Sequence, residues 1–282
     1  MKQVSITVLV ENRAQGHGLL GEHGLAFWIE IGPRRILFDA GQTNVVSHNS
    51  GLLDIDLSSM DAIVLSHGHY DHTGGLAAVA RSKTSREKRV AAYAHPQALE
   101  AKYARNPDGT GRYIGMAADS KTALRESFEL LKTEAPIEIG EGLTVTGPIP
   151  RLTDFEDTGG PFFTDAECLQ PDDLTDDQSA FLETSAGTVV ILGCAHAGIV
   201  NTLRYIMQLA PDRPIHTVIG ETHLIGAGDT RMNKTVEALR AINIQRLLPL
   251  HCTGFQAAAR LWKEFPDRVR ACPVGTKVEL PV

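Results

Sequence analysis

The sequence predicts an α/β fold, because strand-like and helix-like segments alternate along it and histidines follow the ends of three predicted strands. The chain has 282 residues, of which 43% are hydrophobic, enough to bury one large core or two modest ones. Such alternation is typical of βα units, in which strands lie side by side in a sheet and helices cover that sheet.

The first third of the chain is predicted to be strands joined by short loops. Four segments are rich in β-branched or aromatic residues and are bounded by Gly, Pro or Asp: Val4–Val10, Leu25–Ile31, Arg35–Phe38 and Ala62–Leu65. A helix over Leu76–Arg81 and a strand over Val90–Tyr93 follow them. A sheet therefore starts close to the N-terminus.

Residues 96 to about 176 break this alternation, and we expect an insert there. The segment contains a polar stretch, predicted to be helical over 118–132, and then an acidic tract rich in turn residues. Its polar composition favours a solvated surface loop. A lid over a binding site is the second interpretation, because long loops in compact domains often cover sites.

Regular structure is predicted to resume at residue 180. The expected strands cover 180–184 and 188–192, a stretch ending at Ile219-Gly220, and 246–250, and the expected helices cover 199–209, 231–242 and 255–264. Strand-then-helix units thus occur on both sides of the insert. We expect a single domain over residues 1–282, with the insert at about 96–176.

Composition argues against several classes of function. The formal net charge is −7 and the pI is about 5.9, so we expect no nucleic-acid partner. No stretch approaches the ~20 apolar residues of a membrane helix, and the first apolar stretch is too short for a secretion signal. The four cysteines lack C-x-x-C spacing, which fits a reducing compartment. We expect a cytoplasmic protein with a small-molecule substrate and no membrane partner, and a homo-oligomer is left open.

One short stretch, LSHGHYDHTGGL at 65–76, carries three histidines and an aspartate within six positions. His67 and His69 are two residues apart and point to the same side of an extended chain, so both can bind one ion. Asp71 and His72 follow where the chain turns into a helix, and can bind a second ion nearby. Imidazole and carboxylate ligands suit zinc, manganese or iron. We expect two divalent ions, with zinc preferred over manganese or iron.

Two more histidines occupy comparable positions. His196 follows the predicted strand at 188–192 and His251 follows the one at 246–250, as His67 follows Leu65. Ligand sites in α/β sheets gather at the carboxyl ends of strands. These positions favour a shared site.

The histidine pattern resembles the metallo-β-lactamase superfamily, whose H-x-H-x-D-H motif matches this chain at His67, His69, Asp71 and His72. The resemblance covers nearly the whole chain and implies an αββα four-layer sandwich, with two mixed β-sheets flanked by helices. It also implies that His196, in GCAHAG, completes the first metal site. His251, in LPLHCTG, would be the last histidine of the second metal site. In LFDAG, Asp39 is the implied partner of a metal-bound histidine.

One position departs from the superfamily pattern. The carboxylate that bridges the two ions is usually an Asp in a strand-Gly-Asp segment, and the corresponding segment here reads VIGETHL. Glu221 occupies the expected place and is the candidate bridging ligand. His223, two residues further on, is the alternative ligand or a proton donor.

Other segments resemble the branch of the superfamily that contains dihydropterin ribofuranosylaminobenzene phosphate synthases and metal-dependent hydrolases. They include VLVEN at 8–12, EHGLAFWIE at 22–30 and LGCAHAGIVNTL at 192–203. Two adjacent cations favour hydrolysis of a phosphoester or carbonyl substrate by a metal-bound hydroxide, with Asp71 and His223 as the catalytic residues. The alternative is a transferase that joins a pterin carbon to an aromatic ribosyl phosphate. The substrate itself is left open.

Two cysteines lie near the expected ligands in the sequence, and a further histidine lies in the N-terminal tract. Cys194 and Cys252 are close to His196 and His251, but alternate residues of a strand face opposite sides, so we expect both thiols to pack against the sheet. His23 either lines the rim of the pocket or is an exposed loop residue.

Overall fold

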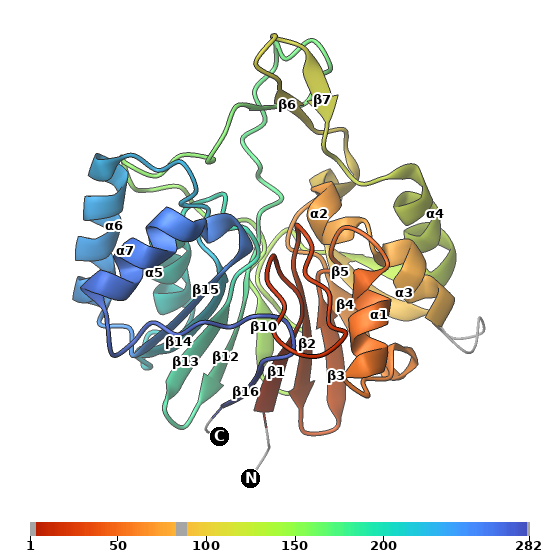
Figure 1. The fold of residues 1–282 in the computed structure, drawn as a ribbon, viewed down its shortest axis with the longest axis horizontal. Coiled ribbons are helices and arrows are strands. Elements are labelled where there is room, and N and C mark those ends of the chain that lie inside the picture. The colour runs from red at the N-terminus through yellow and green to blue at the C-terminus, as the bar shows by residue number, and fades with distance from the viewer. Residues whose placement is uncertain (1–3, 83–88, 281–282) are drawn as a thin grey trace.

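The computed structural model describes residues 4–82 and 89–280. Two large mixed β-sheets pack face to face, and helices cover the outer face of each sheet (Figure 1). This is the four-layer αββα sandwich, so the predicted fold class is confirmed. Among the described residues, no helix combines the length and the apolar character that crossing a membrane requires.

The first sheet contains seven strands in the order β16-β1-β2-β3-β4-β5-β8. Strands β3, β4, β5 and β8 run parallel, and the remaining pairs are antiparallel. The strands are β1 (Val4–Val10), β2 (Ala26–Ile31), β3 (Arg34–Phe38), β4 (Ala62–Val64), β5 (Val90–Ala94), β8 (Phe128–Lys132) and β16 (Lys277–Leu280). On its outer side lie the helices α1 (Val45–Leu52), α3 (Leu76–Ser82) and α4 (Ala118–Ser127), together with the 3₁₀ turn η1 (Leu57–Ser59).

The second sheet contains six strands in the order β15-β14-β13-β12-β10-β9. They are β9 (Ile137–Glu138), β10 (Leu143–Val145), β12 (Ala180–Thr184), β13 (Gly187–Ile191), β14 (Ile215–Glu221) and β15 (Arg246–Leu250). Helices α5 (Ile199–Leu209), α6 (Asp229–Ile242) and α7 (Phe255–Glu264) cover its outer face. Because β13, β14 and β15 are parallel neighbours, their carboxyl ends meet at one edge.

The core has three apolar layers, one between the sheets and one under the helices on each side. Phe27 and Phe38 belong to the layer between the sheets and are fully buried. Helix α5 buries Ile199, Leu203 and Ile206, which recur at helical spacing and so share one face. Burial of each such side chain stabilises the fold by about 1.5–3 kcal/mol. A helix that places all three on one buried face is therefore favoured, and the periodicity predicted it correctly.

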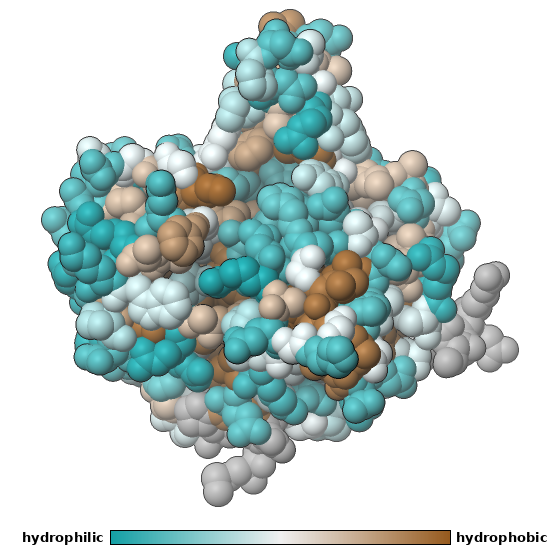
Figure 2. Space-filling view, viewed as in Figure 1, coloured by the Kyte–Doolittle hydropathy of each residue, from teal (hydrophilic) through white to brown (hydrophobic). Residues whose placement is uncertain are grey.

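A small third sheet projects beyond the sandwich (Figures 1 and 2). Its strands are β6 (Tyr103–Arg105), β7 (Gly111–Tyr113) and β11 (Phe162–Phe163). At its base, the buried Lys102 Nζ donates to Asp172 Oδ2 at 3.0 Å and to Asp176 Oδ1 at 2.8 Å. These two ion pairs hold the two ends of the projecting segment together.

The segment expected as an insert, 96–176, therefore contributes to more than one part of the molecule. Only β6, β7 and β11 form the projecting sheet, whereas β8, β9 and β10 belong to the two main sheets. The predicted helix over 118–132 was wrong in its last five residues. Helix α4 ends at Ser127, and β8 pairs in parallel with β5. In this stretch, pairing with β5 outweighs the local preference for a helix.

Candidate metal centre

The predicted site residues meet at the edge where β4, β13, β14 and β15 end. Three short elements position parts of this edge: α2 (Tyr70–Thr73), the 3₁₀ turn η2 (Pro96–Leu99) and the 3₁₀ turn η3 (His251–Thr253). All eight residues that the sequence singled out are buried, namely His67, His69, Asp71, His72, His196, Glu221, His223 and His251. The structure brings together residues from both halves of the chain, and their role as metal ligands remains a prediction.

Three imidazoles form the first donor set. One ring nitrogen each of His67, His69 and His196 lies within 4.8 Å of the other two. The Nδ1 of His196 lies 2.8 Å from the carbonyl oxygen of Thr158, which can only accept, so this nitrogen donates its proton and leaves the Nε2 lone pair free. The buried Nε2 atoms of His69 and His196 have no hydrogen-bond partner among the described residues. The three nitrogens are therefore arranged to bind a cation.

Burial sets the protonation state of these three rings. Desolvation lowers the pKa of His69 to about 3, and it also holds the pKa of His67 and His196 well below the ordinary value. At neutral pH all three imidazoles are therefore neutral, which is the form that binds a metal ion.

The second donor set contains His72, Glu221 and His251. Glu221 Oε2 lies 3.8 Å from His72 Nε2 and 3.9 Å from His251 Nε2, so its carboxylate sits between the two rings. The other oxygen, Oε1, is buried without a partner in the part of the chain that the structure describes. Asp71 Oδ2 is 3.2 Å from His251 Nε2, which adds a second carboxylate to this set. Glu221 is thus a candidate ligand of the second set, and its role as a bridge between two ions stays a prediction.

Asp39 and Ser66 support the histidines from behind. Asp39 Oδ2 accepts from His72 Nδ1 and from Ser66 Oγ, both at 2.7 Å, and Oδ1 accepts from Ser66 N at 2.7 Å. Burial alone would lower the pKa of His72, but the adjacent Asp39 carboxylate outweighs it and raises that pKa to about 9. The backbone of Asp39 lies in the left-handed region, with a φ of 58°. Asp39 therefore fixes the ring orientation of His72.

His251 and Asp71 are held by residues at the start of the chain. Asn12 Oδ1 lies 2.6 Å from His251 Nδ1, which leaves Nε2 facing Asp71. His23 reaches the same carboxylate, with its Nε2 3.2 Å from Asp71 Oδ2, although 58% of its side chain is exposed. Burial would raise the pKa of Asp71, but hydrogen bonds from His23 and His251 outweigh this effect and lower it well below the ordinary value. His23 therefore reaches the candidate centre from an exposed position, and its place at a pocket rim stays a prediction.

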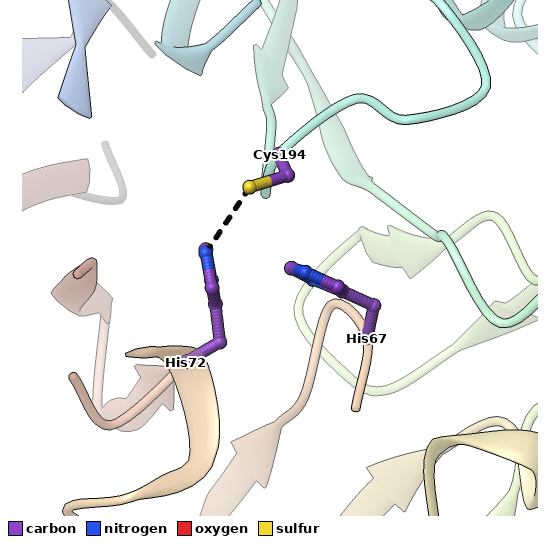
Figure 3. Close-up of side chains that lie close together, drawn as sticks. All are labelled: His67, His72 and Cys194. Atoms are coloured by element: carbon purple, nitrogen blue, oxygen red, sulfur yellow. Dashed lines mark hydrogen bonds between the residues drawn. The ribbon is translucent and has the colours of Figure 1, made fainter. Parts of the chain in front are cut away.

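The prediction for the two cysteines was wrong. Cys194 points toward His67 and His72, and its Sγ lies 3.3 Å from His72 Nε2 (Figure 3). The same sulfur lies 3.0 Å from Glu221 Oε2. Cys252 Sγ belongs to a group with Cys194 and His223 whose donor atoms lie within 4.8 Å of one another. Strand alternation failed here because both residues lie beyond their strands, Cys194 after β13 and Cys252 in η3.

The projecting segment also supplies residues that the sequence did not reveal. The ring of Phe162 lies over the site, with its centroid 5.2 Å from that of His69 and 5.3 Å from that of His196. Gly159 packs so closely on the His223 ring that a Cβ atom there would overlap it. These contacts place the segment over the histidines, as the lid interpretation predicts. The polar sequence of this segment has no periodicity from which its position over the histidines could have been predicted.

The chain is similar to several known proteins over most of its length. Residues 34–153 match the family model of the β-lactamase superfamily domain. The crystal structure of a protein described as a metal-dependent hydrolase of the β-lactamase superfamily is 29% identical, with a TM-score of 0.80, and the match covers 99% of this chain and 100% of that chain. An uncharacterized protein of Methanocaldococcus jannaschii is 34% identical over 91% of this chain and 93% of its own length.

The chain belongs to the metallo-β-lactamase superfamily. Another relative within its branch is the 7,8-dihydropterin-6-methyl-4-(β-D-ribofuranosyl)-aminobenzene-5'-phosphate synthase of the same archaeon. It is 30% identical over 87% of this chain and 86% of its own length. Members of the superfamily are largely enzymes, and the donor sets described above are its candidate metal-binding residues in this chain.

Proposed function

We propose that this protein is a metal-dependent hydrolase that acts on a small phosphoester or carbonyl substrate. The convergence of His67, His69 and His196, with two buried and unpartnered Nε2 atoms, carries the proposal. A buried polar atom without a partner costs about 1–3 kcal/mol, so such atoms call for a ligand. Neutral imidazoles are suitable donors for a divalent cation, and these residues therefore fit the metal that the superfamily implies.

Two sets of residues would hold the ions. His67, His69 and His196 would bind the first, and Asp71, His72 and His251 would bind the second, with Glu221 between them. Bound divalent ions activate water at neutral pH and screen the negative charge that develops on an attacked phosphoryl or carbonyl oxygen. The chain itself contributes orientation, because Asp39 fixes the ring of His72 and the Thr158 carbonyl fixes that of His196.

His223 is the remaining residue predicted to take part in catalysis. Its ring centroid lies 4.2 Å from that of His196, and its Nδ1 is buried without a partner among the described residues. Two roles fit this position, that of a proton donor to the leaving group and that of a metal ligand. The thiols beside it favour the second role.

A cavity beside the candidate centre fits a small-molecule substrate. It has a volume of about 490 Å³ and opens next to His251. Phe255 and Trp262 supply apolar surface, and Glu11 and Arg13 supply polar groups. Mostly apolar pockets of this size with a few polar groups are typical of ligand sites.

The test is turnover of phosphodiester, lactone and thioester panels with and without a chelator. His69→Ala should reduce kcat/KM at least 100-fold, because it removes one donor of the first set. His48→Ala is the matched control, since His48 is bonded to the Gly18 carbonyl on an exposed surface away from the candidate centre. Hydrolytic activity that survives removal of the metal would rule out a metal-dependent hydrolase.

A transferase is the second candidate, and the 30% identity to the synthase favours it. In that case the ions would stabilise a diphosphate leaving group while a pterin carbon is joined to an aromatic ribosyl phosphate. Incubation with a hydroxymethylpterin diphosphate and an aminobenzene ribosyl phosphate separates the two candidates. Release of diphosphate that requires both substrates would support the transferase, and release without the second substrate would support hydrolysis.

A further inference from the structure

Three parallel neighbouring strands each deliver a metal-binding side chain to the same buried point. Cys194 follows β13, His223 follows β14 and Cys252 follows β15. Because the carboxyl ends of parallel strands meet at one edge, residues far apart in the sequence become neighbours there. All three residues are buried, and both cysteines are free thiols.

The three side chains form a compact donor set. The two Sγ atoms and a ring nitrogen of His223 lie within 4.8 Å of one another. Zinc binds sulfur at about 2.3 Å and nitrogen at about 2.0–2.1 Å, which places the donors of a tetrahedral site about 3.5–3.8 Å apart. The donors lie within 4.8 Å, so they would need to close in by about 1.3 Å at most. Rotation of the side chains can provide this.

One further observation indicates a cation at this point. The Nδ1 of His223 is buried and has no hydrogen-bond partner in the described part of the chain. A buried polar atom without a partner costs about 1–3 kcal/mol, and a bound cation would remove this cost. Packing of the two thiols against a sheet would not.

We propose that Cys194, His223 and Cys252 form a further cation site, next to the two donor sets described above, that takes a soft divalent ion such as zinc or cadmium. Thiolate ligands select soft cations over magnesium or manganese. The Glu221 Oε2 lies 3.0 Å from Cys194 Sγ, so a carboxylate of the second donor set borders this point and adds negative charge beside it. This assignment makes His223 a ligand, and it does not depend on the reaction that the protein catalyses.

Cobalt substitution tests the proposal without reference to activity. The reduced protein, loaded with Co²⁺ under anaerobic conditions, should show the near-ultraviolet charge-transfer band of thiolate bound to cobalt. Cys252→Ser should lower the intensity of this band to about half, because one of the two sulfur ligands of the site is removed. Cys272→Ser is the matched control and should leave the band unchanged, since Cys272 is fully buried in the core between the sheets.

A measurement on the wild-type protein covers the case in which a serine variant does not fold. X-ray absorption at the zinc edge should show a sulfur shell at about 2.3 Å. A shell of nitrogen and oxygen alone would overturn the proposal. A disulfide between Cys194 and Cys252 in the reduced, cobalt-loaded protein would also overturn the proposal. A cobalt band that disappears in Cys194→Ser but keeps its full intensity in Cys252→Ser would also overturn it, because the sulfur would then belong to the His72 set.

Discussion

Replacing Asp39 with asparagine should weaken metal binding on the His72 side of the centre. The carboxylate of Asp39 accepts three hydrogen bonds of 2.7 Å, from Ser66 N, Ser66 Oγ and His72 Nδ1. Because a carboxylate can only accept, His72 keeps a proton on Nδ1. A cation that binds must displace the second proton from Nε2, which faces Glu221, and the lone pair of Nε2 is then available to the cation.

An asparagine amide has only one oxygen for these three donors. When that oxygen accepts from Ser66 N, the NH₂ group faces His72 Nδ1, which must become an acceptor. The ring proton then moves to Nε2 and blocks the lone pair that would bind the metal. Loss of such a partner typically weakens metal affinity about 10- to 100-fold, which corresponds to about 1.4–2.7 kcal/mol.

Competition with a chromophoric chelator measures the dissociation constant of each ion in wild type and Asp39→Asn. Asp61→Asn is the control, because Asp61 also accepts a backbone hydrogen bond, from Arg35 N at 2.9 Å, but on an exposed surface. We expect one ion to bind more weakly in Asp39→Asn and no change in the control. A folded Asp39→Asn protein that binds every ion as tightly as wild type would refute the orienting role of Asp39.

Two other substitutions test the lid segment. Lys102→Met should destabilise the protein by about 3–5 kcal/mol at pH 7, because it leaves the buried Asp176 without its cation. Its acidic partners outweigh burial and raise the pKa of Lys102 above its ordinary value of 10.5. In urea denaturation the difference from wild type should therefore be constant from about pH 7 to pH 10.5 and shrink above pH 10.5. Equal free energies of unfolding for Lys102→Met and wild type at pH 7 would contradict this prediction. Gly159→Ala should displace the ring of His223, whereas Gly142→Ala, which has the same φ of 83° but open space around it, should not. If the ring chemical shifts of His223 are the same in both variants, the contact between Gly159 and His223 does not position the ring.

Most of the fold could be predicted from local patterns, because apolar periodicity reports burial. The boundaries of α5, β15 and α7 agree with the predicted 199–209, 246–250 and 255–264. Helix α1 and strands β10 and β16 were not predicted, and the stretch Phe128–Lys132 was predicted as helix but is a strand. Its five residues are too few for periodicity to separate strand from helix, and pairing with β5 decides the outcome.

The candidate site was predictable only in part. Spacing brought His67, His69, Asp71 and His72 together, and placement after strands favoured a shared site with the two later histidines. The positions of Cys194 and Phe162 could not be foreseen, because they depend on loop backbone and on a long segment that folds over the site. Neither strand nor helix periodicity constrains side chains in such regions.

Anomalous diffraction at the zinc edge, from crystals grown with zinc, tests the central claim most directly. The account predicts one peak enclosed by His67, His69 and His196, and a second about 3.5–4 Å away beside Asp71, His72 and His251. Bound zinc that leaves the first three histidines without an ion between them would contradict it.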